Sequence, residues 1–174
     1  MNMSSNHSNN HSNTISKNTN NDRKLETNLE QLCNIYDSER FKYAVVCVNC
    51  CHFKKIKLKK YPSGYDKIYT HMVKQLAEAI KISETKYNSS EFVVLADLHK
   101  TRMKQIDTKF IKNLIVILEN TFPDRLKYCI IRNAPSIFKI IYKLIYPWVD
   151  KDTRHKFMFE SKGKLKKILS SDLK

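Results

Sequence analysis

The feature that most constrains the fold is a short helix, predicted at residues 135–146, that follows a predicted buried strand at 126–132. The strand is a short apolar run rich in Ile, Tyr and Cys. Asn133 suits the position that caps a helix, and Pro135 suits the first helical turn, where a missing N–H is no loss. Pro147 favours an end of the helix just before it. At ~18 Å, the helix is too short to cross a bilayer, which takes about 20 residues.

This predicted helix is apolar around almost its whole circumference. Its apolar residues are Ile137, Phe138, Ile140, Ile141, Tyr142, Leu144, Ile145 and Tyr146. Only Ser136, Lys139 and Lys143 are polar, and the two lysines lie four residues apart on one face. A helix of this kind is either deeply buried or faces something other than water. From the periodicity alone, a central core helix and a lipid-facing helix are both open.

Several short motifs surround the helix in a fixed order. They are Phe122-Pro123-Asp124-Arg125-Leu126, Asn133-Ala134-Pro135, Phe138, Tyr146-Pro147-Trp148 and Thr153-Arg154-His155-Lys156-Phe157. Together they closely resemble the CRAL-TRIO lipid-binding domain family, which includes the yeast phosphatidylinositol-transfer protein. The resemblance extends more weakly back to Phe41 and forward to Ile168.

The resemblance implies an α/β fold, with a mixed, mostly parallel β-sheet, flanking helices and a lipid-binding domain over residues 41–170. The apolar helix would be the gate over a pocket that holds one lipid or another hydrophobic molecule. The gate and pocket residues would be Ile137, Phe138, Ile141, Tyr142, Leu144, Ile145 and Trp148. The implied function is non-enzymatic binding, and either transfer between membranes or sensing, of a ligand such as phosphatidylinositol.

The same resemblance implies a headgroup site at Asp124, Thr153 and Lys156. Lys supplies a positive charge for a phosphate, Thr a hydroxyl donor, and a carboxylate accepts from sugar hydroxyls. The family has Glu where this chain has Asp124, whose side chain is one methylene shorter. The alternative interpretation is that Asp124 and Lys156 are surface charges beside two turns.

The chain carries a formal net charge of +15. Such a charge points to a polyanionic partner, either nucleic acid or an anionic membrane surface, without choosing between them. We expect Lys139, Lys143, Lys166 and Lys167 to face a membrane. Residues 165–173 have the pattern of a basic amphipathic helix, which either packs on the sheet, as in the family, or lies on a membrane.

The N-terminal part has two predicted sections. Residues 1–22, rich in Asn and Ser, contain too few apolar side chains to fold, and we expect a disordered tail. They lack the apolar core of a signal peptide, which predicts a protein inside the cell. With the lysines and the resemblance added, we expect a cytoplasmic protein with peripheral membrane association. The spacing of Leu25, Leu29, Leu32 and Tyr36 predicts one helix over 24–37, which cannot supply the helical bundle that precedes the domain in many CRAL-TRIO proteins.

Further elements follow from periodicity. We expect strands at 43–49, 54–60 and 92–96, and helices at 65–86 and 108–120. The lysine-rich segment 54–60 reads either as an exposed edge strand or as a basic patch. The alternation of helices and strands argues for a sheet with helices packed on it, independently of the resemblance.

Cys47, Cys50 and Cys51 cluster beside His52. A Cys-x-x-Cys pair is half of a zinc site, but no second pair lies at ligand spacing. Free thiols in a reducing compartment are the favoured interpretation, and an odd total of 5 Cys argues against a disulfide framework. We expect no metal and no cofactor.

The sequence argues against enzymes with familiar phosphate or nucleophile loops. With only two glycines, Gly64 and Gly163, it has no dinucleotide-binding loop, no Walker loop and no GxSxG elbow. Three functions are open: a lipid-binding or lipid-transfer protein, a lipid-free CRAL-TRIO scaffold that binds a protein partner, and a nucleic-acid binder, ranked last. We expect a monomer.

Overall fold

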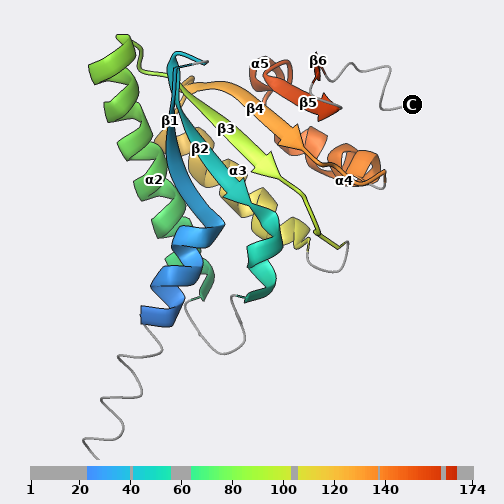
Figure 1. The fold of residues 1–174 in the computed structure, drawn as a ribbon. Helices are drawn as coiled ribbons and strands as arrows, with labels where there is room; N and C mark the ends of the chain where they lie inside the picture. The colour runs from blue at the N-terminus through green and yellow to red at the C-terminus, as the bar shows by residue number, and fades with distance from the viewer. Residues whose placement is uncertain are drawn as a thin grey trace, which may run out of the picture.

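A six-stranded sheet forms the centre of the computed structural model, which describes residues 23–39, 41–55, 64–102, 106–136, 138–161 and 164–167 (Figure 1). The strands are β1 (Cys33–Ser38), β2 (Tyr43–Asn49), β3 (Phe92–Asp97), β4 (Leu126–Arg132), β5 (Phe157–Ser161) and β6 (Lys164–Lys167). They lie in sequence order; the three central pairs are parallel and the two outer pairs are antiparallel. The predicted mixed, mostly parallel sheet with flanking helices is confirmed.

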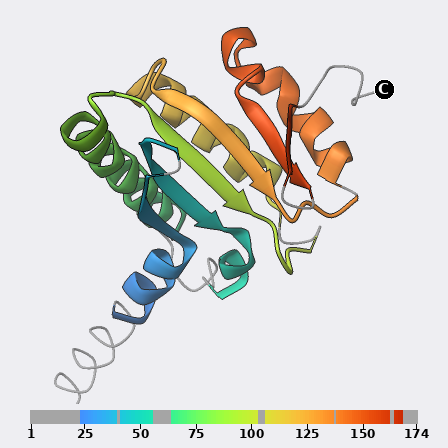
Figure 2. The same ribbon diagram turned by 45° about the horizontal axis from the view of Figure 1, so that its top comes forward.

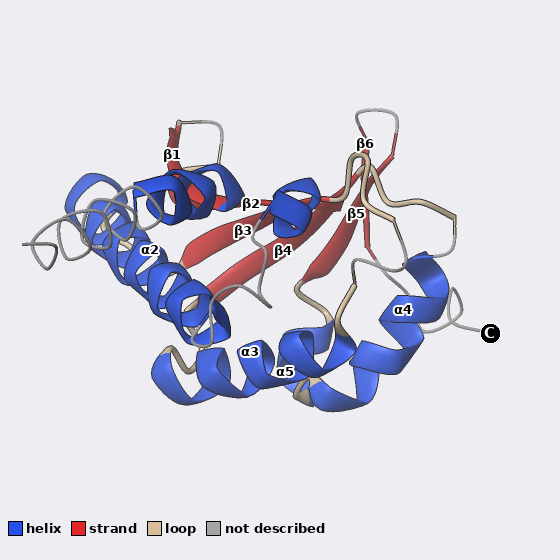
Figure 3. Cartoon of the chain, turned by 90° about the horizontal axis from the view of Figure 1, so that it is seen from below, coloured by secondary structure: helices blue, strands red, loops and turns tan. Residues whose placement is uncertain are grey.

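The main helices all lie on one face of this sheet. They are α2 (Gly64–Tyr87), α3 (Thr108–Thr121), α4 (Phe138–Ile145) and α5 (Lys151–Arg154), and η1 (Cys50–Lys55) and η4 (Tyr146–Trp148) are 3-10 helices. Crossovers between parallel strands are right-handed, and the strand order never reverses, so each crossover helix falls on the same side. Figure 2 shows the parallel strands side by side, and Figure 3 shows the helices as one layer against them.

The strands β2 to β5 run in the same direction. Their first residues therefore form one edge of the sheet, the amino edge, and their last residues form the other, the carboxyl edge. The loops into α2 and α3 leave from the carboxyl edge, whereas the turn from α3 into β4 and the connection from α5 into β5 lie at the amino edge.

The longest helix packs directly on the sheet. Ile68, Met72, Leu76 and Ala79 recur at spacings of four and three along α2, and all are buried. They share one cluster with the helix-facing residues of β1 and β2. The buried Ser83 hydroxyl accepts from the backbone N–H of Ala44 at 2.9 Å, which joins the far end of α2 to the start of β2.

Local periodicity located most of the elements. The strands predicted at 43–49 and 126–132 have the observed bounds, and the strand at 92–96 is one residue longer. The helices predicted at 65–86 and 108–120 correspond to α2 and α3. Asp107 is the N-cap of α3, and its side chain accepts from the N–H of Phe110.

The single helix predicted over 24–37 is wrong in its second half. Residues 23–32 are helical, and Leu25, Leu29 and Leu32 are buried as their spacing predicts. The chain then enters β1, which pairs antiparallel with β2 along its whole length. Tyr36, which continued the helical spacing, lies on the sheet and is 54% exposed. Pairing with a distant strand overrides the local pattern.

Three further expectations need correction or fall outside the described residues. Residues 165–167 of the predicted helix at 165–173 belong to β6, which pairs with β5, and the rest of it lies outside the described residues. Of the predicted strand at 54–60, the first two residues belong to η1, and the others lie outside the residues that the structure describes. Asn133 does not cap α4: it has a left-handed backbone (φ 53°), and its amide donates to Asp97 at 2.9 Å.

Candidate ligand-binding cavity

A cavity of about 660 Å³ lies between the helix layer and the sheet. Side chains alternate between the two faces of a strand, so every second residue of β2, β3 and β4 faces it. These residues are Val46 and Val48, Val94 and Ala96, and Cys129 and Ile131. The opposite wall comes from α2, α3 and α4, and the lining is predominantly apolar. Such a volume and lining are typical of a site for a small hydrophobic ligand.

The helix α4 turns one apolar face to this cavity. Phe138, Ile141, Tyr142 and Ile145 line it, and each is at most 8% exposed. Their spacing of three, one and three residues places them on one helical face. Ile137, also predicted to face the pocket, lies outside the described residues.

The other face of α4 differs from what the sequence led us to expect. Leu144, predicted to line the pocket, is 54% exposed and points away from it, as does Ile140. Lys143 is exposed beside them. The helix therefore presents two large aliphatic side chains and a lysine to its surroundings.

Aromatic contacts hold the C-terminal end of α4 in place. The Tyr142 ring lies 5.6 Å from Phe157 and 5.8 Å from Tyr146, centroid to centroid. The guanidinium of Arg154 stands 4.3 Å from the centre of the Tyr146 ring, a cation–π contact that links α5 to η4. Trp148 packs beside the cavity without lining it, and Lys112 of α3 lies over its ring at 5.7 Å.

The three predicted headgroup residues all line the same cavity. Asp124 lies in the turn from α3 into β4, Thr153 in α5, and Lys156 in the connection from α5 into β5. These segments meet at the amino edge of the sheet. Asp124 has a left-handed backbone (φ 58°), which Asp tolerates better than most residues.

Sequence reasoning missed two carboxylates at this end of the cavity, Glu119 and Asp150. Asp150 caps α5, and Glu119 at the end of α3 accepts from its backbone N–H at 3.2 Å. Hydrogen bonds from the side chain of Thr153 and from backbone N–H groups hold the pKa of Asp150 below its usual range. The capping pattern Asp-x-x-Thr was visible in the sequence, but its position beside the cavity was not.

The cavity therefore has a mixed polar rim at the amino edge. Among its described lining residues there, Lys156 is the one cation, beside the carboxylates of Glu119, Asp124 and Asp150. One ammonium suits one phosphate, and carboxylates suit groups that donate hydrogen bonds, such as sugar hydroxyls.

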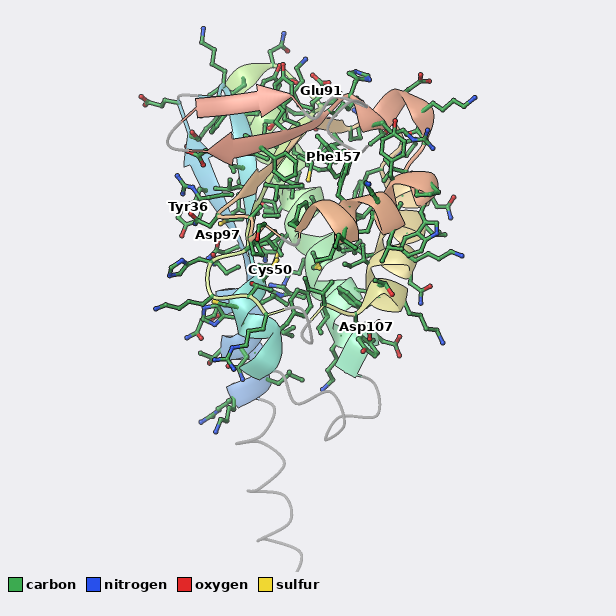
Figure 4. All side chains as sticks on the ribbon, turned by 90° about the vertical axis from the view of Figure 1, so that its right-hand side faces the viewer. Tyr36, Cys50, Glu91, Asp97, Asp107 and Phe157 are labelled. Carbon is green, nitrogen blue, oxygen red and sulfur yellow. The ribbon has the colours of Figure 1, made fainter. Side chains whose placement is uncertain are left out.

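The carboxyl-edge end of the cavity is aromatic. The ring of Phe110 stacks on Tyr69 at 4.9 Å and on Tyr65 at 5.5 Å, and Phe53 meets it edge-on at 5.2 Å. The Tyr65 hydroxyl donates to Asp107, which joins the first turn of α2 to the start of α3. This bond raises the pKa of Tyr65 to about 12 and lowers that of Asp107. Figure 4 shows Asp107 and Phe157 toward opposite ends of the molecule.

Three cysteine thiols, Cys33, Cys50 and Cys129, line the cavity. Burial raises the pKa of each to about 12, so they are protonated and weakly reactive at neutral pH. No group of three or more His, Cys, Asp or Glu side chains in the described ranges is placed to hold a metal ion.

Two other expectations concern the membrane. Lys166 and Lys167 belong to β6, but their side chains, like that of Lys139, are outside the described set. None of the helices in the described part of the chain has the length and apolar character needed to cross a bilayer.

Comparison with known proteins adds three findings. Residues 30–173 match the model of the CRAL/TRIO domain. The CRAL-TRIO domain-containing protein T23G5.2 of Caenorhabditis elegans is 30% identical over 102 residues, which is 56% of this chain but 14% of that protein. The crystal structure of Sfh5 has a similar fold, with a TM-score of 0.56 at 19% identity, over 76% of this chain and 50% of that one. The chain thus spans half or less of the relatives named here.

Proposed function

The chain belongs to the CRAL/TRIO domain family, whose members bind lipophilic ligands, and from this premise we propose that it binds one lipid molecule in the cavity beneath α4, without catalysing a reaction. The observation that carries this proposal is the apolar cavity of about 660 Å³. In this proposal α4 is the gate, because its apolar inner face forms part of the cavity wall and its apolar outer face tolerates a second non-aqueous environment.

The polar end of the lipid lies at the amino edge. Lys156 pairs with a phosphate and Asp124 accepts from hydroxyl groups, with Glu119 and Asp150 as further acceptors. The Thr153 hydroxyl, which donates to Asp150 in this structure, transfers its hydrogen bond to the headgroup when the lipid binds. The headgroup of phosphatidylinositol combines one phosphate with an uncharged ring of hydroxyls. It therefore matches a rim with one lysine and several carboxylates better than a headgroup with several phosphates does.

Exchange of the lipid takes place at an anionic membrane surface. Ile140 and Leu144 insert among the lipid tails while Lys143 and its neighbour Lys139 meet the headgroups. Lys166 and Lys167 add to the attraction. The protein thereby associates peripherally with the cytoplasmic side of a membrane, and either transfers its lipid or senses it.

The first experiment is native mass spectrometry of the purified chain, followed by extraction and identification of any bound molecule. A co-purifying lipid in a one-to-one complex supports the proposal. A folded chain that carries no lipid, and takes none from vesicles, would contradict it.

The headgroup assignment has its own test, the variant Lys156→Glu. We expect at least a tenfold loss in affinity for phosphatidylinositol, since a charge-assisted hydrogen bond is replaced by repulsion. Lys151→Glu is the matched control, because Lys151 is exposed on α5 and does not line the cavity. Equal binding by the two variants would remove Lys156 from the site.

A protein-interaction scaffold is the second candidate, and one observation favours it. The face of the sheet opposite α2–α5 exposes Tyr36 and Tyr128, at 54% and 36%. Exposed aromatic side chains are common in protein interfaces. The same mass-spectrometry experiment separates the two candidates, because a scaffold needs no lipid.

A further inference from the structure

Thr101 carries a hydroxyl group for which the described residues provide no hydrogen-bond partner. It lies in the loop after β3, where its backbone N–H donates to the carbonyl of Leu98 at 3.0 Å. The residue lines the cavity, and its side-chain oxygen is buried without a partner among the described residues. A buried polar group of this kind is unfavourable and rare in native proteins. Since the hydroxyl borders a cavity, a polar group on the bound molecule would account for it.

Asp107 supplies a second polar group at the same end of the cavity. It closes the same loop as the N-cap of α3, and it lines the cavity as Thr101 does. Its carboxylate accepts from the Tyr65 hydroxyl and from the N–H of Phe110. These bonds lower the pKa of Asp107, so the group is ionised at neutral pH. An ionised carboxylate has about four acceptor positions, which leaves capacity for a donor on a ligand.

The surroundings of these two residues favour an uncharged polar group on the ligand. Apolar side chains at this end of the cavity include Phe53, Leu98 and Ile106. A phosphate or carboxylate would be repelled by Asp107. The ring of Phe110 stacks on those of Tyr65 and Tyr69, so these rings pack on one another instead of surrounding a cation. A hydroxyl group fits, because it can donate to Asp107 and accept from Thr101.

We propose that the ligand carries a hydroxyl group on its apolar part, at the end remote from Lys156, and that Thr101 and Asp107 bind this hydroxyl. The ligand is then a hydroxylated lipid with polar groups at two separated positions, whatever its number of hydrocarbon chains. This inference rests on the proposed function and specifies its ligand.

The test uses pairs of fatty acids that differ by one hydroxyl group. Palmitic acid is compared with ω-hydroxypalmitic acid, and oleic acid with ricinoleic acid, whose hydroxyl lies in mid-chain. Displacement of a fluorescent fatty acid from the full chain gives the affinities, and native mass spectrometry gives the stoichiometry. A hydroxyl normally weakens entry into an apolar cavity. We nevertheless expect the hydroxylated member of at least one pair to bind as tightly as its partner, or more tightly.

Two other outcomes of this comparison count against the inference. Weaker binding of the hydroxylated member in both pairs would overturn it and leave the proposed function standing. Binding of none of the four fatty acids would overturn both.

The variant Thr101→Val assigns the effect to the Thr101 hydroxyl, because it removes this group and keeps the shape of the side chain. We expect the ratio of affinities, hydroxylated over plain fatty acid, to fall at least fivefold, since the hydroxyl of the ligand loses its partner. The ratio does not depend on the fraction of folded protein. Thr101→Ser retains a hydroxyl and should restore the ratio. An unchanged ratio in Thr101→Val would contradict the inference.

Two further measurements separate binding from a structural role. Thr85→Val is the matched control, because the Thr85 hydroxyl donates to the carbonyl of Lys81 on the exposed side of α2 and does not line the cavity. This control should leave the ratio unchanged. The empty Thr101→Val chain should resist urea at least as well as the parent chain, since no described hydrogen bond is lost. A clear loss of stability would mean that the hydroxyl already has a partner, and would contradict the inference.

Discussion

The helices α2 and α4 cover the same face of one sheet, yet they are built differently. The 24 residues of α2 bury one apolar stripe, including Ile68, against the strands and present charged side chains such as Lys74 and Lys81 to water. The 8 residues of α4 place apolar side chains on both faces, with Ile141 buried and Ile140 exposed beside Lys143.

The difference shows what an apolar outer face means. The polar outer face of a helix is favourable only in water. Its apolar stripe holds the helix against the core. A helix with an apolar outer face and a cavity beneath it is neither confined to water on its outer side nor fixed by close packing on its inner side. The two helices are thus suited to different roles, α2 to holding the sheet and α4 to opening over a ligand.

The largest expected effect is on the free energy of unfolding. If it is not observed, the contrast between α2 and α4 does not hold. Ile68→Ala in α2 should lower the free energy of unfolding by about 2–5 kcal/mol, because it leaves a void in packed core. Ile141→Ala in α4 should lower it by about 2 kcal/mol or less, since its side chain already borders a cavity. Urea unfolding at neutral pH measures both. Equal losses would mean that α4 is packed as tightly as α2.

The next effect concerns the outer face of α4. Replacing Ile140 and Leu144 together by Glu should weaken binding to anionic vesicles at least tenfold, because burial of each aliphatic side chain in lipid is worth about 1.5–3 kcal/mol. Cosedimentation with vesicles measures it. Val116→Glu, on an exposed position of α3, is the control. Unimpaired vesicle binding by the double variant would argue against α4 as the docking surface.

A smaller effect on stability comes from the hydrogen bond between Tyr65 and Asp107, which joins the start of α2 to the start of α3. The bonds from Tyr65 and from the N–H of Phe110 depress the pKa of Asp107. The contribution of Asp107 to the free energy of unfolding is therefore complete above the pKa that its carboxyl has in the unfolded chain, near 4. This contribution is lost as the pH falls through the lower pKa of the folded chain. Asp107→Ala should reduce stability by about 1 kcal/mol at pH 7 and make stability less dependent on pH below 4. A variant as acid-sensitive as the parent chain would assign that dependence elsewhere.

The smallest effect is kinetic and reports on the space under α4. Alkylation of Cys50 and Cys129, which line the cavity, should slow severalfold when phosphatidylinositol is bound. Cys51, which does not line it, is the internal control within the same chain. Peptide mass spectrometry after timed labelling gives the rates. Equal protection of Cys51 would indicate general stabilisation instead of occupancy.

Much of the fold followed from local patterns. The period of 3.6 along α2 and α3, and the short apolar runs of β2 and β4, give the elements nearly at their observed bounds. These signals are readable because each depends on neighbours within a few residues. The resemblance of the motifs from Phe122 to Phe157 to the CRAL-TRIO family then placed these elements in one fold, and the family match agrees.

Pairing between distant segments could not be read in the same way. The helical spacing that includes Tyr36 and the amphipathic pattern around Leu165 both predicted helices, but each segment pairs with a neighbouring strand. A strand is stabilised by its partner as much as by its own residues, and the partner of β1 is set by the sheet.

The residues from Phe122 to Phe159, taken by themselves, determined that this chain carries an apolar helix between two strands, and the family resemblance they carry assigned Asp124, Thr153 and Lys156 to a headgroup site. Only the tertiary structure brought Glu119 and Asp150 to the same rim, turned Leu144 outward, and left about 660 Å³ between helix layer and sheet. The physical reason is that a helix or strand arises from contacts along the chain, whereas the size and charge of a cavity arise from where separate elements stop packing against one another.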